Sequence, residues 1–229
     1  MKDTDLSFKA KRLLGSVFSY LYLLLICRWW TRLYRLIWEA RYSTTVLTSY
    51  RSIHELVDIM RTCHWTADGW RQLWDAWSYP GRVQSIISTT LEEGRFIGDC
   101  DEFAIYLAAV LEQSSSLGGF ENGRFCLAPY LGGLMVDRAR VLTLIWIDKD
   151  GRYGGHNVCL IDWYDINASR HNPRGADVYS YMDYDYPARA VVDLRGIIEQ
   201  IMEKYACGGR VLAWSIHDKD LKLEEAHRG

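Results

Sequence analysis

The chain has 229 residues, of which 49% are hydrophobic and 24% are charged, and its formal net charge is −2. This composition indicates a globular protein, and the length predicts one compact domain with an appendage. The small negative charge argues against a nucleic-acid-binding protein, because such proteins carry a basic surface for the phosphate backbone.

Metal binding and disulfide bonding are also not indicated. No C-x-x-C pair or Cys/His cluster occurs, so we expect neither a structural zinc site nor another metal or cofactor. Widely scattered single cysteines in a chain of this length favour a reducing compartment. The six are Cys27, Cys63, Cys100, Cys126, Cys159 and Cys207.

Residues 1–45 are predicted to form an apolar and amphipathic helical segment. The apolar run 13–27 is shorter than the ~20 residues that span a bilayer core, and Cys27-Arg28-Trp29-Trp30 is no small-residue cleavage site of a signal peptide. From residue 28 the pattern is amphipathic, with two opposite faces. One holds Arg28, Thr31, Arg32, Arg35 and Glu39, and the other holds Trp29, Leu33, Leu36, Ile37 and Ala40.

Two interpretations of residues 13–40 remain open. Arginines beside tryptophans are typical of a helix that lies on a membrane surface. Alternatively, the helix packs its stripe of large aromatic residues on the domain, which is the commoner fate of such a stripe. The expected location is the cytoplasm, with or without this membrane contact.

The stretch Gly98-Asp99-Cys100-Asp101-Glu102-Phe103-Ala104 runs into an apolar helix. Asp99 is the expected N-cap, and Glu102 completes a pattern like a capping box. A helix N-terminus stabilises an anion and lowers the pKa of a cysteine, which makes Cys100 a candidate nucleophile. Asp99 and Asp101 would oppose a thiolate there, and a buried structural cysteine is the alternative.

A histidine and an aspartate follow in the predicted strands. Residues 139–147 and 156–163 read as two strands joined by a turn at Asp148-Lys149-Asp150-Gly151, and 178–182 reads as a third strand that ends at Asp183. A thiol nucleophile needs a base, and the base needs an acceptor that orients it. His156 and Asp183 are the candidates for these roles.

The last part of the chain is predicted from shorter signals. Residues 197–205 read as a helix that ends at Gly208-Gly209, and 211–216 as an edge strand. The main domain is thus expected to cover 46–216, followed by a charged tail, 217–229, that frays.

The G-D-C-D-E-F-A stretch, with Gly155-His156-Asn157-Val158-Cys159 behind it, resembles the transglutaminase-like superfamily, in particular its bacterial and phage cysteine proteinases. The likeness spans about residues 50–205 and includes the lead-in Trp65-Thr66-Ala67-Asp68-Gly69. It implies an α+β, papain-like fold, in which the nucleophile helix packs on an antiparallel sheet, here with an extra N-terminal helix.

The resemblance also implies a Cys100-His156-Asp183 triad, with Asp165 and Asp185 as competitors for the third place. It allows one of Trp70, Trp74 and Trp77 to stabilise an oxyanion, although core packing is the default for this stripe.

The function expected from these observations is that of a thiol-dependent acyl-transfer enzyme. Hydrolysis of a protein or peptide, as by a cysteine peptidase or amidase, is favoured because no second domain or lid that would exclude water is evident. One alternative is a transglutaminase, in which an amine accepts the acyl group. Another is a non-catalytic binding or structural module that retains the fold.

Overall fold

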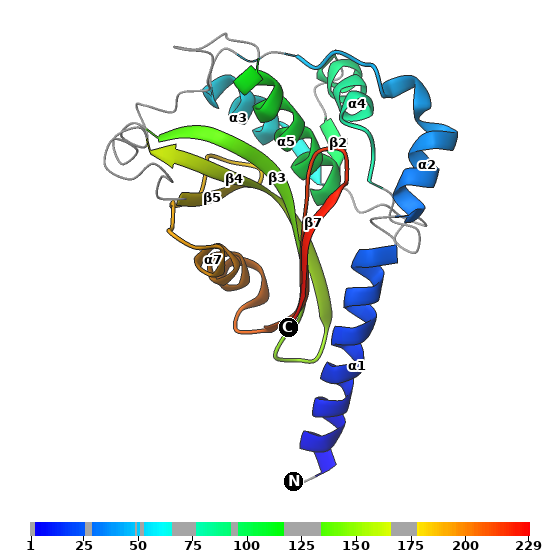
Figure 1. Ribbon diagram of the computed structural model, residues 1–229, viewed down its shortest axis with the longest axis vertical. Helices are drawn as coiled ribbons and strands as arrows, with labels where there is room; N and C mark the ends of the chain where they lie inside the picture. The colour runs from blue at the N-terminus through cyan, green and yellow to red at the C-terminus, as the bar shows by residue number, and fades with distance from the viewer. Residues whose placement is uncertain are drawn as a thin grey trace.

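The computed structural model describes residues 3–25, 29–48, 50, 53–65, 77–92, 96–116, 134–165 and 178–229. Its centre is a five-stranded antiparallel sheet with the strand order β5-β4-β3-β6-β7. Figure 1 shows helices on both faces of this sheet. The predicted α+β class, with a helix packed on an antiparallel sheet, is therefore confirmed.

The two longest strands form the predicted hairpin. They are β3, Leu134–Ile147, and β4, Tyr153–Asp165. Strand β3 begins five residues earlier than expected, and β4 is longer than expected at both ends, because the pairing continues there. The Asp148 side chain closes the turn by accepting hydrogen bonds from the backbone N–H groups of Asp150 and Arg152 at 2.8 Å each. Gly151 has a φ of 80°, which a glycine adopts without strain.

The outer strands differ in part from the prediction. Strand β5, Val178–Met182, lies where it was expected, beside β4. Strand β6, Arg210–His217, is an inner strand, because residues 223–228 of the expected frayed tail form β7, Leu223–Arg228, beside it. The buried side chain of Leu221 anchors the turn between them. Pairing with β6 satisfies the backbone of β7, so a charged sequence can still be a strand.

The two faces of the sheet carry separate cores. Helix α5, Cys100–Ser116, packs on β3 and β4 on one face, with α3, Ile53–Arg61, and α4, Pro80–Glu92, beside it. Helix α7, Leu194–Ala206, covers the other face. Strand β4 alternates between the cores: Cys159 and Ile161 belong to the α5 side, and Val158 and Leu160 to the α7 side.

The chain reaches the start of α5 through a short strand. Strand β2, Phe96–Gly98, pairs in parallel with β1, Cys63–Trp65, and ends two residues before Cys100.

The N-terminal segment forms helix α1, Asp3–Leu25, helix α2, Thr31–Trp38, and the 3-10 helix η2, Ala40–Tyr42. Helix α1 packs against β6 and β7. No helix within the described part of the chain is both long and apolar enough to cross a membrane. The prediction that α2 packs its apolar stripe on the domain is wrong, because Trp29, Leu33, Leu36 and Ile37 are all exposed.

Candidate active site

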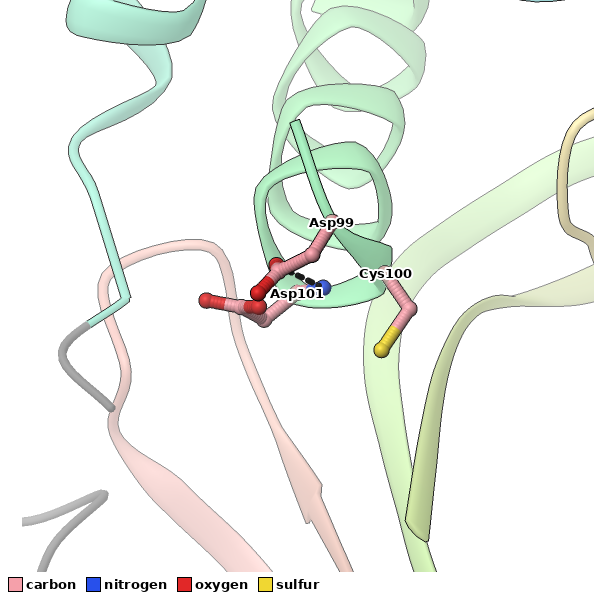
Figure 2. Close-up of side chains that lie close together, drawn as sticks. All are labelled: Asp99, Cys100 and Asp101. Carbon is pink, nitrogen blue, oxygen red and sulfur yellow. Dashed lines mark hydrogen bonds between the residues drawn. The ribbon is translucent and has the colours of Figure 1, made fainter. Parts of the chain in front are cut away.

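Cys100 is the first residue of α5, and the capping pattern expected around it is present. The Asp99 backbone N–H donates to Glu102 Oε2 at 3.2 Å, and the Asp101 N–H donates to Asp99 Oδ1 at 3.2 Å. These bonds satisfy backbone donors that have no partner inside the helix. Figure 2 shows the bond between Asp99 and Asp101 as a dashed line.

The Cys100 side chain leaves the start of α5 beside those of Asp99 and Asp101 (Figure 2), and its sulfur lies within 4.8 Å of a carboxylate oxygen of each. Cys100 as a residue is half-buried. Asn157 of β4 donates a hydrogen bond from Nδ2 to the sulfur, with a donor–acceptor distance of 3.9 Å. The helix N-terminus and this amide both favour negative charge on the sulfur, whereas Asp99 and Asp101 oppose it.

Asn157 was missed by the sequence prediction. Asn157 is 7% exposed, and its side-chain oxygen Oδ1 is buried without a hydrogen-bond partner in the described part of the chain. A buried amide oxygen without a partner costs free energy, so such an atom points to a functional or strained position. Asn157 shares its face of β4 with Cys159 and Ile161, but alternation alone does not say that this face meets α5.

His156 lies on the other face of the sheet. Consecutive residues of a strand point to opposite faces, and the pairing of β4 with β3 is regular at this point, with His156 opposite Leu144. Leu144 belongs to the α7-side core. The expected direct contact between Cys100 and His156 is therefore not formed.

The structure does bring His156 and Asp183 together. His156 Nε2 lies 3.2 Å from Asp183 Oδ1, and the His156 ring lies 4.2 Å from the Tyr205 ring between centroids. Asp183 Oδ2 accepts hydrogen bonds from Tyr205 Oη and from Lys204 Nζ, the latter at 3.2 Å. Tyr205 and Lys204 come from α7, and neither was predicted to be part of a site.

Of the two competing aspartates whose side chains are described, Asp183 and Asp185, the one in contact with His156 is Asp183. It is 6% exposed. Asp185 is largely exposed and pairs with Arg61 at 2.7 Å. Its pKa is lowered, chiefly by a hydrogen bond from the Tyr186 backbone and further by Arg61. The side chain of Asp165 lies outside the described residues.

The tryptophan stripe is described only at Trp77, since Trp70 and Trp74 lie outside the described residues. Trp77 is 1% exposed and belongs to the core on the α5 face, as the default expectation has it.

Two further cysteines provide a comparison for Cys100. Cys159 is completely buried, and this burial raises the pKa of its thiol strongly. Cys207 is exposed at the C-cap of α7. Cys27, Cys126 and the side chain of Cys63 lie outside the described residues.

One group of possible metal ligands occurs among the described residues. Ligand atoms of Asp99, Cys100 and Asp101 lie within 4.8 Å of one another (Figure 2). The Asp99 carboxylate already accepts a backbone hydrogen bond, and the positive end of α5 repels a cation. We therefore assign no metal to this group.

Comparisons of the chain with protein-family models, curated proteins and solved structures found no match. The transglutaminase-like resemblance stays a prediction.

Proposed function

We propose that the protein is a thiol-dependent acyl-transfer enzyme with Cys100 as its nucleophile, most simply a cysteine peptidase or amidase of papain-like type. The observation that carries the proposal is the position of the sulfur: it lies at the N-terminus of a 17-residue helix and accepts a hydrogen bond from the buried Asn157 amide. Both features stabilise a thiolate, which is the reactive form of cysteine.

The proposed reaction has two steps. The Cys100 sulfur attacks the carbonyl carbon of an amide, an S–C bond forms, the C–N bond breaks, and the thiol proton leaves on the amine. Water then attacks the thioester, the S–C bond breaks, and a proton returns to the sulfur. If an amine attacked in place of water, the same intermediate would give transamidation.

The separation of His156 from Cys100 favours a second candidate function. A Cys-His-Asp triad requires the imidazole within hydrogen-bond reach of the nucleophile, and here His156 bonds to Asp183 on the other face of the sheet. This arrangement fits a binding or structural module that retains the fold without turnover.

Selective alkylation tests the nucleophile assignment. Intact protein is treated with iodoacetamide between pH 5.5 and 9, and each cysteine is followed by mass spectrometry. We expect Cys100 to react below pH 8 and faster than Cys207, while Cys159 stays unmodified because it is buried. Equal or slower modification of Cys100 than of Cys207 would remove Cys100 as nucleophile.

Two variants separate the contributions of the neighbouring residues. Asn157→Asp keeps the side-chain shape and places a carboxylate about 4 Å from the sulfur, so alkylation at pH 7 should be at least about tenfold slower. His156→Ala should leave the rate nearly unchanged because His156 lies across the sheet. If His156→Ala is the slower of the two, and circular dichroism shows both folded, the described placement of His156 is wrong.

Acyl-enzyme trapping decides between the two functions. A fluorogenic activated ester and a mixture of peptide amides are offered to the wild type and to Cys100→Ala. An acyl adduct mapped to Cys100 and released by water or by hydroxylamine supports the enzyme. Rapid alkylation of Cys100 without any acyl adduct supports the non-catalytic module.

A further inference from the structure

The two N-terminal helices turn polar side chains toward the rest of the protein. In α1 the buried Ser16 donates from Oγ to the Leu212 carbonyl at 2.8 Å, and Arg228 Nε donates to Ser16 Oγ at 3.0 Å. Ser19 is also buried. Helix α1 is therefore held on the domain by these hydrogen bonds together with the buried Leu23, which belongs to the core on the α5 face.

Helix α2 is docked in the same way. Thr31 and Arg35 are buried on its inner side, and Arg35 donates to the carbonyl oxygens of Trp77 and Ser78 at 2.8 and 2.6 Å. Glu39, at the C-cap of α2, is 1% exposed and accepts from the Tyr79 backbone N–H at 2.8 Å and from Arg82.

The outer faces of both helices are apolar. In α1 the exposed apolar side chains recur at the helical spacing i, i+4, i+7 and i+11, on the side opposite Ser16 and Ser19. These are Leu14, Phe18, Leu21 and Leu25. Ten of the 13 exposed large apolar side chains of the described residues fall between 13 and 38. They are Leu13, Leu14, Phe18, Leu21, Leu25, Trp29, Leu33, Leu36, Ile37 and Trp38. We call these ten residues the outer apolar surface.

The two helices that carry this surface lie along one side of the molecule. Figure 1 shows α1 and α2 following one another along the right-hand side of the view, with α7 on the opposite side of the sheet. A concentration of exposed large apolar side chains on two successive helices is typical of a binding surface for a protein or a membrane.

The charge of the segment distinguishes between these occupants. Residues 6–38 contain six basic residues and no acidic one, so they carry +6, whereas the whole chain carries −2 and the remainder therefore −8. Arg35 is directed inward, but Arg32 is exposed beside the apolar stripe. A basic charge next to exposed Trp and Leu side chains complements an anionic lipid surface, where tryptophan also prefers to lie.

We propose that the outer apolar surface of α1 and α2 binds the surface of an anionic lipid bilayer, with both helices lying along the interface. The proposal does not depend on the chemistry of Cys100.

Vesicle co-sedimentation of the full chain tests the proposal. The probes are vesicles of phosphatidylcholine with 30 mol% phosphatidylserine and vesicles of phosphatidylcholine alone, each at low and at high salt. We expect binding to the anionic vesicles, weaker binding at high salt because the charges are screened, and much weaker binding to the neutral vesicles.

The decisive variant is Phe18→Ser with Leu36→Ser, since these side chains are 66% and 69% exposed and their loss should not affect folding. Removing both apolar contacts should weaken binding at least about tenfold. Arg32→Gln should weaken it about fivefold on anionic vesicles only. The matched control is Val46→Ser, which replaces a side chain that is 84% exposed outside this surface and should bind like the wild type.

Light scattering and thermal unfolding complete the experiment. All variants should unfold at the wild-type temperature. Unchanged binding by the double variant overturns the proposal. A dimer that the double variant dissociates, with no vesicle binding by the wild type, also overturns it and identifies a second copy of the chain as the occupant.

Discussion

The surroundings of the buried His217 predict how the free energy of unfolding changes with pH. His217 is 0% exposed at the end of β6, and its ring stands edge-on to Trp77 with centroids 5.2 Å apart. Neither ring nitrogen has a hydrogen-bond partner in the described part of the chain. Burial lowers the pKa of His217 from 6.5 to about 4, with smaller opposing effects of Glu224, which raises it, and Arg32, which lowers it.

This depressed pKa destabilises the folded protein in acid. Between pH 6.5 and about 4 the unfolded chain binds the His217 proton while the folded protein does not. The stabilisation that comes from keeping His217 neutral is therefore fully present above pH 6.5. It decreases as the pH falls from 6.5 to about 4 and decreases no further below that pH. One pKa unit corresponds to about 1.4 kcal/mol, so the loss at pH 4.5 is about 2 to 3 kcal/mol.

Urea unfolding followed by tryptophan fluorescence at pH 7.5 and 4.5 measures this loss. His217→Leu removes the proton-binding group, so the variant should lose about 2 to 3 kcal/mol less than the wild type between the two pH values. Carboxylates that titrate in the same range contribute equally to both proteins. His227→Leu, at a largely exposed position on β7, is the control and should follow the wild type. Equal losses for His217→Leu and wild type would refute the reasoning.

Two further predictions concern buried polar contacts. Glu39→Ala leaves Arg82 and the Tyr79 N–H without their buried acceptor, so urea unfolding should show a destabilisation of about 3 to 5 kcal/mol. The control Glu199→Ala, in an exposed pair with Arg195, should lower the free energy of unfolding by less than about 0.5 kcal/mol. Similar values for the two variants would contradict the burial of Glu39. Asp183→Asn weakens the shared acceptor of His156, Lys204 and Tyr205 and should lower the free energy of unfolding by about 1 to 3 kcal/mol. The control Asp185→Asn, at an exposed position, should lower it by less than about 1 kcal/mol. A larger loss for Asp185→Asn than for Asp183→Asn would show that the Asp183 contacts do not stabilise the fold.

Local signals in the sequence predicted local structure correctly. The Asp99 and Glu102 pair forms the expected cap of α5, Asp148 forms the expected turn, and β5 has the predicted bounds. Each of these features depends on residues within a few positions of one another. The sequence therefore contains the whole interaction.

The face that β4 presents to α5 could not be predicted in this way. Val158 and Leu160 fill the core on the α7 side, and Cys159 and Ile161 fill the core on the α5 side. When both faces of a strand are apolar, alternation does not say which face meets which helix. A shift of one residue would exchange His156 and Asn157, and only the pairing with β3 decides between them.

The orientation of α2 also depends on contacts distant in sequence. Its amphipathic pattern was clear, and the usual inference is that the apolar face turns inward. Here the backbone carbonyls of Trp77 and Ser78 stand against the helix and require donors, which Arg35 supplies. A buried carbonyl without a donor is costly. Burial lowers the pKa of Arg35 to about 10, so its guanidinium remains charged at neutral pH while it makes these bonds.

The contacts of α2 end at the start of the helix that carries Cys100. Ser78 Oγ lies 3.3 Å from Glu39 Oε1 and 3.1 Å from Glu102 Oε1, and Glu102 in turn accepts from the Asp99 N–H at 3.2 Å. The Ser78 hydroxyl has one proton, so it donates to only one of the two carboxylates at a time. Ser78 thus stands between Glu39, at the C-cap of α2, and Glu102, which caps the helix holding the thiol. The end of α2 and the start of the cysteine-bearing helix α5 therefore share one short series of buried polar contacts.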